Sequence, residues 1–480
     1  MAKPGLQPST VLDGFHIESL VHRGGMARLW SVSKPGIDIS LLMKVPILGE
    51  GVDPAAIVSF EMEQMIMPRL SGPNVPIFVA AGDFAVHPYI VMERLPGKSL
   101  LPRTMELPLS YEEVARIGWQ VATALDNLHR QHVIHLDIKP SNILFRPSGE
   151  AVLIDFGLSR HLQLPDLMQE EFRLPYGTAP YMAPEQLLGI RHDARSDQFA
   201  LGVLLYFFST GVRPFGESES FRAMKKRLWR DPKPPRQLRP DYPAWLQEIV
   251  LRCLEIEPAW RYPSAAQLAF ELSHHDQIKL TARSERLKRD SFATVLKRRL
   301  NPEHRKDWIP RTAAAPSPAA PIIAVAVDLS SEAQATNEAL REASARALTA
   351  FPAARLACLN VLRQSLIATR DTTLDEEGHN KHVNRLVELQ HWAQPLRRGE
   401  GRITYHVLES TDPASAILEY AKQNKVDQIL LGARQSSLMR TLLGSVSAKV
   451  AGEAACTVTI VRPSHRETSA SASEAAANSS

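Results

Sequence analysis

The pattern of apolar residues in the first half of the chain predicts both strands and long helices. Strand-like apolar runs cover Phe15–Leu20 and Ala27–Val32, and Tyr89–Leu95 reads as a buried strand. Helical spacing of apolar residues covers Pro54–Leu70 and, more regularly, Tyr111–Gln131. The residues that follow the second of these helices therefore form a loop at the end of a long helix.

The second half of the chain alternates short apolar runs with helical patterns. The five predicted strands are Ile322–Val327, Arg355–Leu362, Ile403–Leu408, Val426–Leu431 and Thr457–Val461. The predicted helices between them are Ser331–Ala350, His382–Arg397, Pro413–Asn424 and Ser445–Ala455. Strands joined by crossover helices give a parallel, doubly wound sheet, and any ligand is expected at the carboxyl ends of its strands.

Length and composition predict a folded, multidomain protein. A chain of 480 residues with 44% hydrophobic residues is too long for one ordinary core. The three cysteines, Cys253, Cys358 and Cys456, have no metal-site or disulfide spacing and are expected to be buried thiols in a reducing cytoplasm. No signal peptide opens the chain, and the most apolar run, Phe199–Val212, is shorter than a bilayer span, so we expect a soluble, cytoplasmic protein without a transmembrane segment.

Positive charge gathers between the two halves. Residues 281–311 hold ten Lys or Arg and four acids, whereas the whole chain has a net charge of only +4, so no nucleic-acid partner is expected. We interpret this stretch as an amphipathic or solvated connector whose apolar residues pack on a domain: Leu287, Phe292, Val295, Leu296 and Leu300. A surface for anionic lipid or RNA is the less favoured alternative. An Ala/Pro-rich linker, 312–321, follows.

Candidate chemistry is concentrated in His135-Leu136-Asp137-Ile138-Lys139-Pro140-Ser141-Asn142 and in Asp155-Phe156-Gly157. Asp137 can orient and deprotonate an attacking hydroxyl, and Lys139 can neutralise a transferring phosphoryl group. Asn142 and Asp155 offer the oxygen ligands that Mg²⁺ prefers. These residues resemble the protein-kinase family, and the resemblance extends over roughly Phe15–Leu272. It implies a two-lobed α+β kinase fold that uses ATP and Mg²⁺.

The resemblance also implies a nucleotide site upstream. Val21, Gly24 and Gly25 lie in the phosphate-covering loop, although His22 and Ala27 stand where the family's first and third glycines would be. Lys44 would bind the α- and β-phosphates, with Glu63 as its partner and Glu61, expected to face solvent, as the fallback. Met92 would be the gatekeeper, and the backbone of Glu93 to Leu95 would meet the adenine.

The activation segment, between Asp155-Phe156-Gly157 and Ala183-Pro184-Glu185, departs from the common family pattern. Leu136 replaces the arginine that binds an activating phosphate, and 160–175 contain no serine or threonine. We therefore expect a kinase of the type without that arginine, either constitutively ordered or controlled by other means. Asp166, Glu170 and Glu171 could supply fixed negative charge, but a solvated acidic loop is the preferred interpretation.

Further matches concern the acceptor and the buried framework. Gly177-Thr178 and Lys139 resemble the serine/threonine branch, so the protein substrate would be phosphorylated on Ser or Thr. By the same resemblance Asp197 anchors the catalytic loop and Arg261 pairs with Glu185. The alternative function is a pseudokinase scaffold that binds nucleotide without phosphoryl transfer.

Residues 321–463 resemble the universal stress protein family, on Val325-Ala326-Val327-Asp328-Leu329-Ser330, on 427–434 and on Leu443-Gly444-Ser445-Val446-Ser447. The resemblance implies a second adenine nucleotide, with Asp328 near the adenine or ribose and Gly432, Gly444, Ser445 and Ser447 around the phosphates. However, Gln435 replaces a glycine of the ATP-binding members, and Asp328 could instead cap the first helix. Relatives dimerise through the last strand, so a homodimer through this domain is a further expectation.

These patterns divide the chain into four parts. The kinase-like domain is expected over 15–275, the basic and then Ala/Pro-rich linker over 276–320, and the stress-protein-like domain over 321–463. The last residues, 464–480, are rich in Ser, Ala and Glu and are expected to be a disordered tail.

Overall fold

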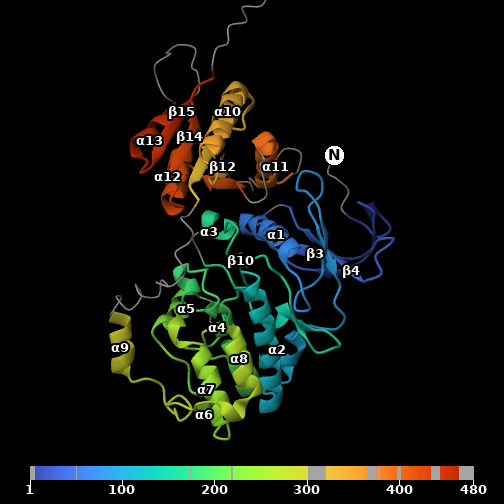
Figure 1. Cartoon of the computed structure of the whole chain (residues 1–480), viewed down its shortest axis with the longest axis vertical. Coiled ribbons are helices and arrows are strands. Elements are labelled where there is room, and N and C mark those ends of the chain that lie inside the picture. Colours follow the sequence, from blue (N-terminus) through green and yellow to red (C-terminus); the bar gives the residue numbers. More distant parts are fainter. Residues whose placement is uncertain are drawn as a thin grey trace, which may run out of the picture. The chain divides into compact units, whose positions relative to one another are not determined.

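The structure is a computed structural model (Figure 1). It describes residues 6–49, 51–172, 175–217, 220–300, 320–364, 373–375, 379–396, 402–433 and 444–463. The chain divides into two units, Met1–Ala315 and Pro316–Ser480. No helix among the described residues has the length and hydropathy needed to cross a bilayer. The predicted tail, 464–480, and most of the predicted Ala/Pro-rich linker lie outside the described residues.

The first unit begins with an antiparallel sheet of order β1-β2-β3-β4-β6-β5. Its strands are β1 (Val11–Leu12), β2 (Phe15–Arg23), β3 (Ala27–Ser33), β4 (Leu41–Pro46), β5 (Phe78–Ala81) and β6 (Ile90–Glu93). Alternate residues such as Phe15, Ile17, Leu41 and Met43 are buried in one cluster, which is what the period of a half-buried strand requires. The sheet places Lys44 on β4, between β3 and β6.

Helix α1 (Pro54–Ile66) packs against β4. It starts where the sequence predicts, because the Asp53 carboxylate accepts the Ala55 N–H and Pro54 occupies the first turn. It ends earlier than predicted, since Met67–Arg69 forms a 3₁₀ turn that contains Pro68.

The rest of the first unit is mainly helical. Its helices are α2 (Tyr111–Arg130), α3 (Leu167–Glu171), α4 (Arg195–Thr210), α5 (Phe221–Met224), α6 (Pro235–Leu238), α7 (Ala244–Cys253), α8 (Ala265–Ser273) and α9 (Phe292–Leu300). Helix α2 packs against α4 and α8, and α4 packs against α7. Gly202 permits the last contact, because a Cβ there would lie 2.5 Å from the Cβ of Cys253. Two short antiparallel pairs, β7 (Val133–Ile134) with β10 (Arg160–His161) and β8 (Ile143–Phe145) with β9 (Ala151–Leu153), carry the loops of the candidate site.

The basic stretch after α8 contacts the first unit through ion pairs and not, as predicted, through its apolar residues. Arg283 pairs with Glu248 and Glu255, and Arg298 pairs with Asp231. Four of the residues predicted to pack are exposed by 38% or more: Leu287, Phe292, Leu296 and Leu300. That prediction was wrong because the carboxylates of the large helical part bind the arginine side chains and leave the apolar face of α9 outward.

The second unit is a five-stranded parallel sheet of order β13-β12-β11-β14-β15. Its strands are β11 (Ile322–Ala326), β12 (Arg355–Arg363), β13 (Ile403–Ser410), β14 (Gln428–Gly432) and β15 (Thr457–Val461). Its helices are α10 (Gln334–Ala350), α11 (Lys381–Ala393), α12 (Pro413–Gln423) and α13 (Ser445–Glu453). Each element lies within a few residues of its predicted position, because near-continuous apolar runs are typical of strands buried on both faces.

The order of the strands places the helices on both faces of this sheet. The chain moves outward from β11 to β13 through α10 and α11 and then returns to β14 and β15 through α12 and α13. Right-handed crossovers in opposite directions put the two helix pairs on opposite faces, and α12 and α13 contact each other (Figure 1). The predicted fold class, a two-part α+β unit followed by a doubly wound α/β unit, is confirmed.

Candidate active site

Lys44 on β4 binds two carboxylates from distant segments. Its Nζ lies 2.5 Å from Oε2 of Glu63 on α1 and 2.9 Å from Oδ1 of Asp155, which follows β9. Burial acts to lower the pKa of Lys44, but the carboxylates of Asp155 and Glu63 outweigh it and raise that pKa. The charge of Lys44 in turn lowers the pKa of Asp155. Lys44 and Asp155 therefore stay charged around neutral pH. Burial raises the pKa of Glu63, against the opposing effect of the Lys44 charge. Glu63 is the predicted partner of Lys44.

Glu61 differs from its prediction. Its side chain was expected to face solvent, but the residue is only 9% exposed. Its helix contacts both β4 and the short helix α3, so little of α1 remains open to water.

Asp137 is the centre of a second cluster. Its carboxylate accepts the backbone N–H of Thr178 at 3.0 Å and the Thr178 hydroxyl at 2.7 Å, and it lies 2.6 Å from Nζ of Lys139. Lys139 also donates to the Thr178 hydroxyl at 2.9 Å. The side-chain amide of Asn142 donates to the backbone oxygen of Asp137 at 3.0 Å and to its Oδ2 at 3.1 Å. One carboxylate is therefore held by a cation, an amide and a hydroxyl.

Asp197 fixes the loop that carries Asp137. Its buried carboxylate accepts the backbone N–H groups of His135 and Leu136 at 2.9 and 2.8 Å, and it contacts the His129 ring at 2.9 Å. Leu136 has a φ of 62°, an uncommon conformation for a non-glycine residue, which these bonds hold in place. The predicted anchoring role of Asp197 is confirmed by these contacts.

Glu185 and Arg261 form the predicted buried ion pair. Their two hydrogen bonds measure 2.6 and 2.8 Å, and the two side chains are 1% and 0% exposed. The Ser196 hydroxyl donates a further hydrogen bond of 2.7 Å to Glu185. This pair joins the end of the activation segment to the helical part of the unit.

The predicted phosphate-covering loop and adenine-contacting segment lie on the same sheet as Lys44. Val21 is near the end of β2, and Gly24 and Gly25 form the turn to β3, where Gly24 N–H donates to Ala27 O at 3.0 Å. Glu93 ends β6, and Leu95 follows two residues later. The structure thus brings these residues to one sheet with Lys44, while their contact with a nucleotide stays a prediction.

The Glu93 side chain has a structural contact that the sequence did not reveal. Its two oxygens accept from the Arg146 guanidinium at 2.5 and 2.8 Å. The hydrogen bond from Arg146 lowers the pKa of Glu93, so the pair stays charged. Because Arg146 also donates to Pro73 O at 2.8 Å, the end of β6 is tied to two other segments.

Asp166 is buried, whereas the acidic stretch of the activation segment was expected to be a solvated loop. It is 4% exposed, and its carboxylate binds Arg191 at 2.8 Å and Arg160 at 3.1 Å. The prediction of a solvated loop was wrong for this residue, because arginines before and after it in the sequence meet it in the fold.

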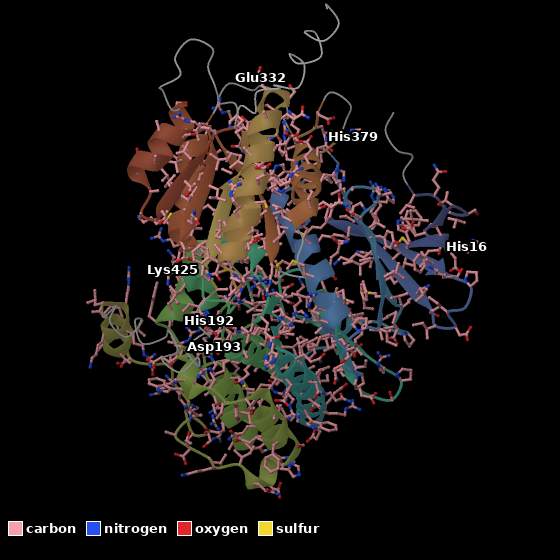
Figure 2. All side chains as sticks on the ribbon, turned by 45° about the horizontal axis from the view of Figure 1, so that its top comes forward. His16, His192, Asp193, Glu332, His379 and Lys425 are labelled. Atoms are coloured by element: carbon pink, nitrogen blue, oxygen red, sulfur yellow. The ribbon has the colours of Figure 1, made fainter. Side chains whose placement is uncertain are left out.

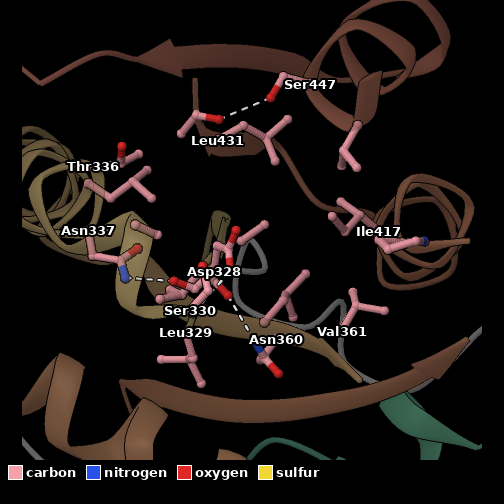
Figure 3. Close-up of a pocket in the computed structure, with 18 of the residues that line it drawn as sticks. Asp328, Leu329, Ser330, Thr336, Asn337, Asn360, Val361, Ile417, Leu431 and Ser447 are labelled. Atoms are coloured by element: carbon pink, nitrogen blue, oxygen red, sulfur yellow. Dashed lines mark hydrogen bonds between the residues drawn. The ribbon is translucent and has the colours of Figure 1, made fainter. Parts of the chain in front are cut away.

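The second unit contains a cavity of about 560 Å³ at the carboxyl ends of β11 and β14 (Figure 3). All five residues predicted from the stress-protein resemblance line it: Asp328, Gly432, Gly444, Ser445 and Ser447. The Ser447 hydroxyl donates to Gly432 O at 3.0 Å, and the Asp328 carboxylate accepts the Ser330 N–H at 3.1 Å. Gln435 lies outside the described residues.

Polar groups that the sequence did not single out also line this cavity. The side-chain amides of Asn337 and Asn360 donate to Asp328 O and Val327 O, at 2.7 and 2.9 Å (Figure 3). Their buried Oδ1 atoms accept no hydrogen bond within the described structure. The lining also contains two arginines, Arg363 and Arg385. The cavity therefore offers acceptors and cations together, as an anionic ligand with N–H or O–H groups requires.

Comparisons with known proteins agree with this division. Residues 51–275 match the protein kinase domain family, and residues 321–462 match the universal stress protein family. The chain is 33% identical over 281 residues to the serine/threonine-protein kinase pkn3 of Myxococcus xanthus, which covers 56% of this chain and 51% of that protein. It is 30% identical over 297 residues to a probable serine/threonine-protein kinase of Corynebacterium efficiens, over 60% of this chain and 45% of that protein.

The chain thus spans about half the length of the curated relatives that it matches. Among solved structures, the kinase domain of PknI from Mycobacterium tuberculosis is similar with a TM-score of 0.44 and 24% identity, over 56% of this chain and 99% of that one. From the two family matches and the two folds, we conclude that the chain carries a protein kinase domain followed by a domain of the universal stress protein family.

Proposed function

We propose that the protein is a serine/threonine protein kinase that transfers the γ-phosphate of ATP to Ser or Thr hydroxyls of a protein substrate. The observation that carries the proposal is the joint placement of Lys44, Glu63 and Asp155 in one cluster and of Asp137, Lys139 and Asn142 in the next. The named kinases among its relatives support the same activity.

In this proposal Asp137 orients the substrate hydroxyl and accepts its proton. The hydroxyl oxygen bonds to the γ-phosphorus as the bond from that phosphorus to the β–γ bridging oxygen breaks, and ADP leaves with the electron pair. Lys139, 2.6 Å from Asp137, neutralises charge on the transferring group. Lys44, kept protonated by its two carboxylates, binds the α- and β-phosphates.

Asn142 and Asp155 are the proposed Mg²⁺ ligands. Both offer hard oxygen donors, and the Asp155 side chain is 47% exposed, so it is open to a ligand despite its contact with Lys44. When bound, the metal neutralises charge on the phosphate oxygens. Val21, Gly24 and Gly25 would cover the phosphates, and the backbone from Glu93 to Leu95 would hold the adenine.

Leu136 argues for a kinase of the type that lacks the phosphate-binding arginine. Leu136 is 4% exposed and its side chain carries no charge, so it cannot bind an activating phosphate. The contact of Thr178 with Asp137 and Lys139 supports the assignment to the serine/threonine branch.

For the second unit we propose a bound adenine nucleotide in the cavity, with Asp328 toward the adenine or ribose. Gly432, Gly444, Ser445 and Ser447 would then surround the phosphates, and Ser445 and Ser447 lie in the first turn of α13, where N–H groups favour an anion. A homodimer through β15, the domain limits at 275 and 321, and a cytoplasmic location also stay proposals, the last from the cysteine usage.

One experiment tests the kinase proposal. Wild type and Asp137→Asn are incubated with MgATP and a generic basic protein substrate, and phosphate transfer and nucleotide binding are followed in parallel. We expect transfer by the wild type that is lost in the variant while nucleotide binding persists. A wild type that binds ATP but transfers no phosphate would instead identify the scaffold that is the alternative function.

A further inference from the structure

One buried carboxylate, Asp166, holds the first part of the activation segment against the body of the first unit. Asp166 has a side chain only 3% exposed, and its Oδ2 lies 2.8 Å from Nε of Arg191 and 3.1 Å from Nη1 of Arg160. Its Oδ1 accepts the Gln169 N–H at 3.3 Å and so caps α3. A single side chain therefore starts a helix and binds two cations.

Both arginines belong to well-anchored segments. Arg160 lies on β10, which pairs with β7 immediately before the loop of Asp137. Arg191 also donates to Leu158 O at 3.0 Å, in the first turn after Asp155-Phe156-Gly157. It directly precedes His192 and Asp193, labelled in Figure 2, and Asp193 binds the N–H and guanidinium of Arg195 at the start of α4.

The helix that Asp166 caps reaches the nucleotide cluster through α1. Helix α3 packs against α1 (Figure 1), with Leu167 and Met168 4% and 2% exposed. Helix α1 carries Glu63, which binds Lys44 at 2.5 Å. A continuous set of contacts thus runs from Asp166 through α3 and α1 to Lys44.

Regulated kinases of this family commonly order this segment with a phosphate bound to arginine, because a phosphate adds negative charge and strong acceptors. Here the residues for that device are missing, because Leu136 replaces the arginine and 160–175 contain no side-chain hydroxyl that could accept a phosphate. A carboxylate with two arginines supplies the same chemistry permanently.

We propose that Asp166 is a positioning residue that orders the activation segment without phosphorylation and thereby keeps Glu63 against Lys44. The inference rests on the proposed kinase function, which it deepens by assigning how the site is kept assembled. It predicts a kinase that is active as synthesised.

The test uses the full chain and needs two arms. In the first, wild type is treated with a broad-specificity phosphatase, the phosphatase is removed, and the initial rate of phosphate transfer to a basic protein is measured. In the second, Asp166→Asn and the milder Arg160→Gln are compared with Asp276→Asn, which removes an exposed carboxylate from the helical part. Rates are expressed per nucleotide-binding chain, and hydrogen exchange of α1 is measured.

We expect phosphatase-treated wild type and Asp276→Asn to stay within about twofold of untreated wild type. Asp166→Asn should lose roughly 10- to 100-fold in kcat, since a misplacement of about 1 Å in a positioned group can cost about 100-fold. Arg160→Gln should lose less, because Arg191 remains. Amides of α1 should exchange faster in Asp166→Asn. A variant that only lowered the amount of folded chain would leave α1 exchange unchanged in the chains that still bind nucleotide.

Two results would overturn the inference and leave the proposed function standing. One is a loss of more than tenfold in wild type after phosphatase treatment, and the other is unchanged kcat and α1 exchange in Asp166→Asn. A failure of Asp166→Asn to fold leaves the decision to the phosphatase arm and to Arg160→Gln. A wild type without any transfer refutes the proposed function, and the inference with it.

Discussion

Replacing Glu185 by glutamine should strongly destabilise the first unit. The change is nearly isosteric, so packing is kept, but it leaves the Arg261 guanidinium buried without its carboxylate. Arg261 would retain its hydrogen bonds to the backbone oxygens of Glu255 and Arg195, at 3.0 and 2.9 Å, which stabilise the group but do not neutralise it. Removing one partner of a buried ion pair costs about 3–5 kcal/mol of folding free energy.

For a domain of this size, about 1 kcal/mol lowers Tm by roughly 2–4 °C, so Glu185→Gln should lower the Tm of the first unit by roughly 6–20 °C. Differential scanning calorimetry of the full chain measures this shift, and the transition of the second unit serves as an internal reference. Glu106→Gln is the matched control, because Glu106 pairs with Arg103 at 2.9 Å and its side chain is 54% exposed. A Glu185→Gln transition within 2 °C of wild type, on the order of a surface substitution, would refute the reasoning.

Two further predictions concern acid stability and the second unit. Burial, with nearby positive charge, lowers the pKa of His161, so the unfolded chain binds more protons than the folded chain. The free energy of unfolding should therefore fall as the pH drops below about 6.5. His161→Gln should flatten this slope in urea titrations between pH 5 and 7, whereas an unchanged slope would contradict it. Gly432→Val should abolish nucleotide binding to the second unit, because even a Cβ there would lie 2.2 Å from Cγ2 of Thr336. Titrating wild type and Gly432→Val with MgATP should give two sites and one site, and equal stoichiometries would count against the second nucleotide.

The sequence predicted the elements of both units well where local pattern decides them. The period of apolar residues identified α2 and the five parallel strands, and the resemblance to the protein-kinase family singled out Lys44, Glu63 and Asp137. Helix α1 was predicted too long, because a 3₁₀ turn with Pro68 continues a helical apolar pattern that the backbone no longer follows. These features depend on neighbours in the sequence, which is why they can be predicted from it.

Contacts between distant charged side chains could not be predicted in the same way. Glu93 and Arg146 are 53 positions apart, and Asp166 and Arg191 are 25 positions apart. No local sequence pattern indicates which residue pairs with which. A charge run usually indicates a solvated surface, so Asp166 was interpreted as solvated and Arg298 as part of an amphipathic or solvated connector that packs through its apolar residues. Only the tertiary fold decides which carboxylate receives which arginine.

The central claim is that Asp155, which binds Lys44, also serves as a ligand of the Mg²⁺ needed for phosphate transfer. The most direct test is the Mg²⁺ dependence of transfer with and without the Asp155 carboxylate. Single-turnover transfer of labelled γ-phosphate to a basic protein should be measured for wild type and Asp155→Asn over a range of Mg²⁺ concentrations. We predict transfer by wild type that rises with Mg²⁺ and a loss of at least about 100-fold in Asp155→Asn, since electrostatic stabilisation supplies most of the catalysis. Equal rates in the two proteins, or transfer independent of Mg²⁺, would contradict the account.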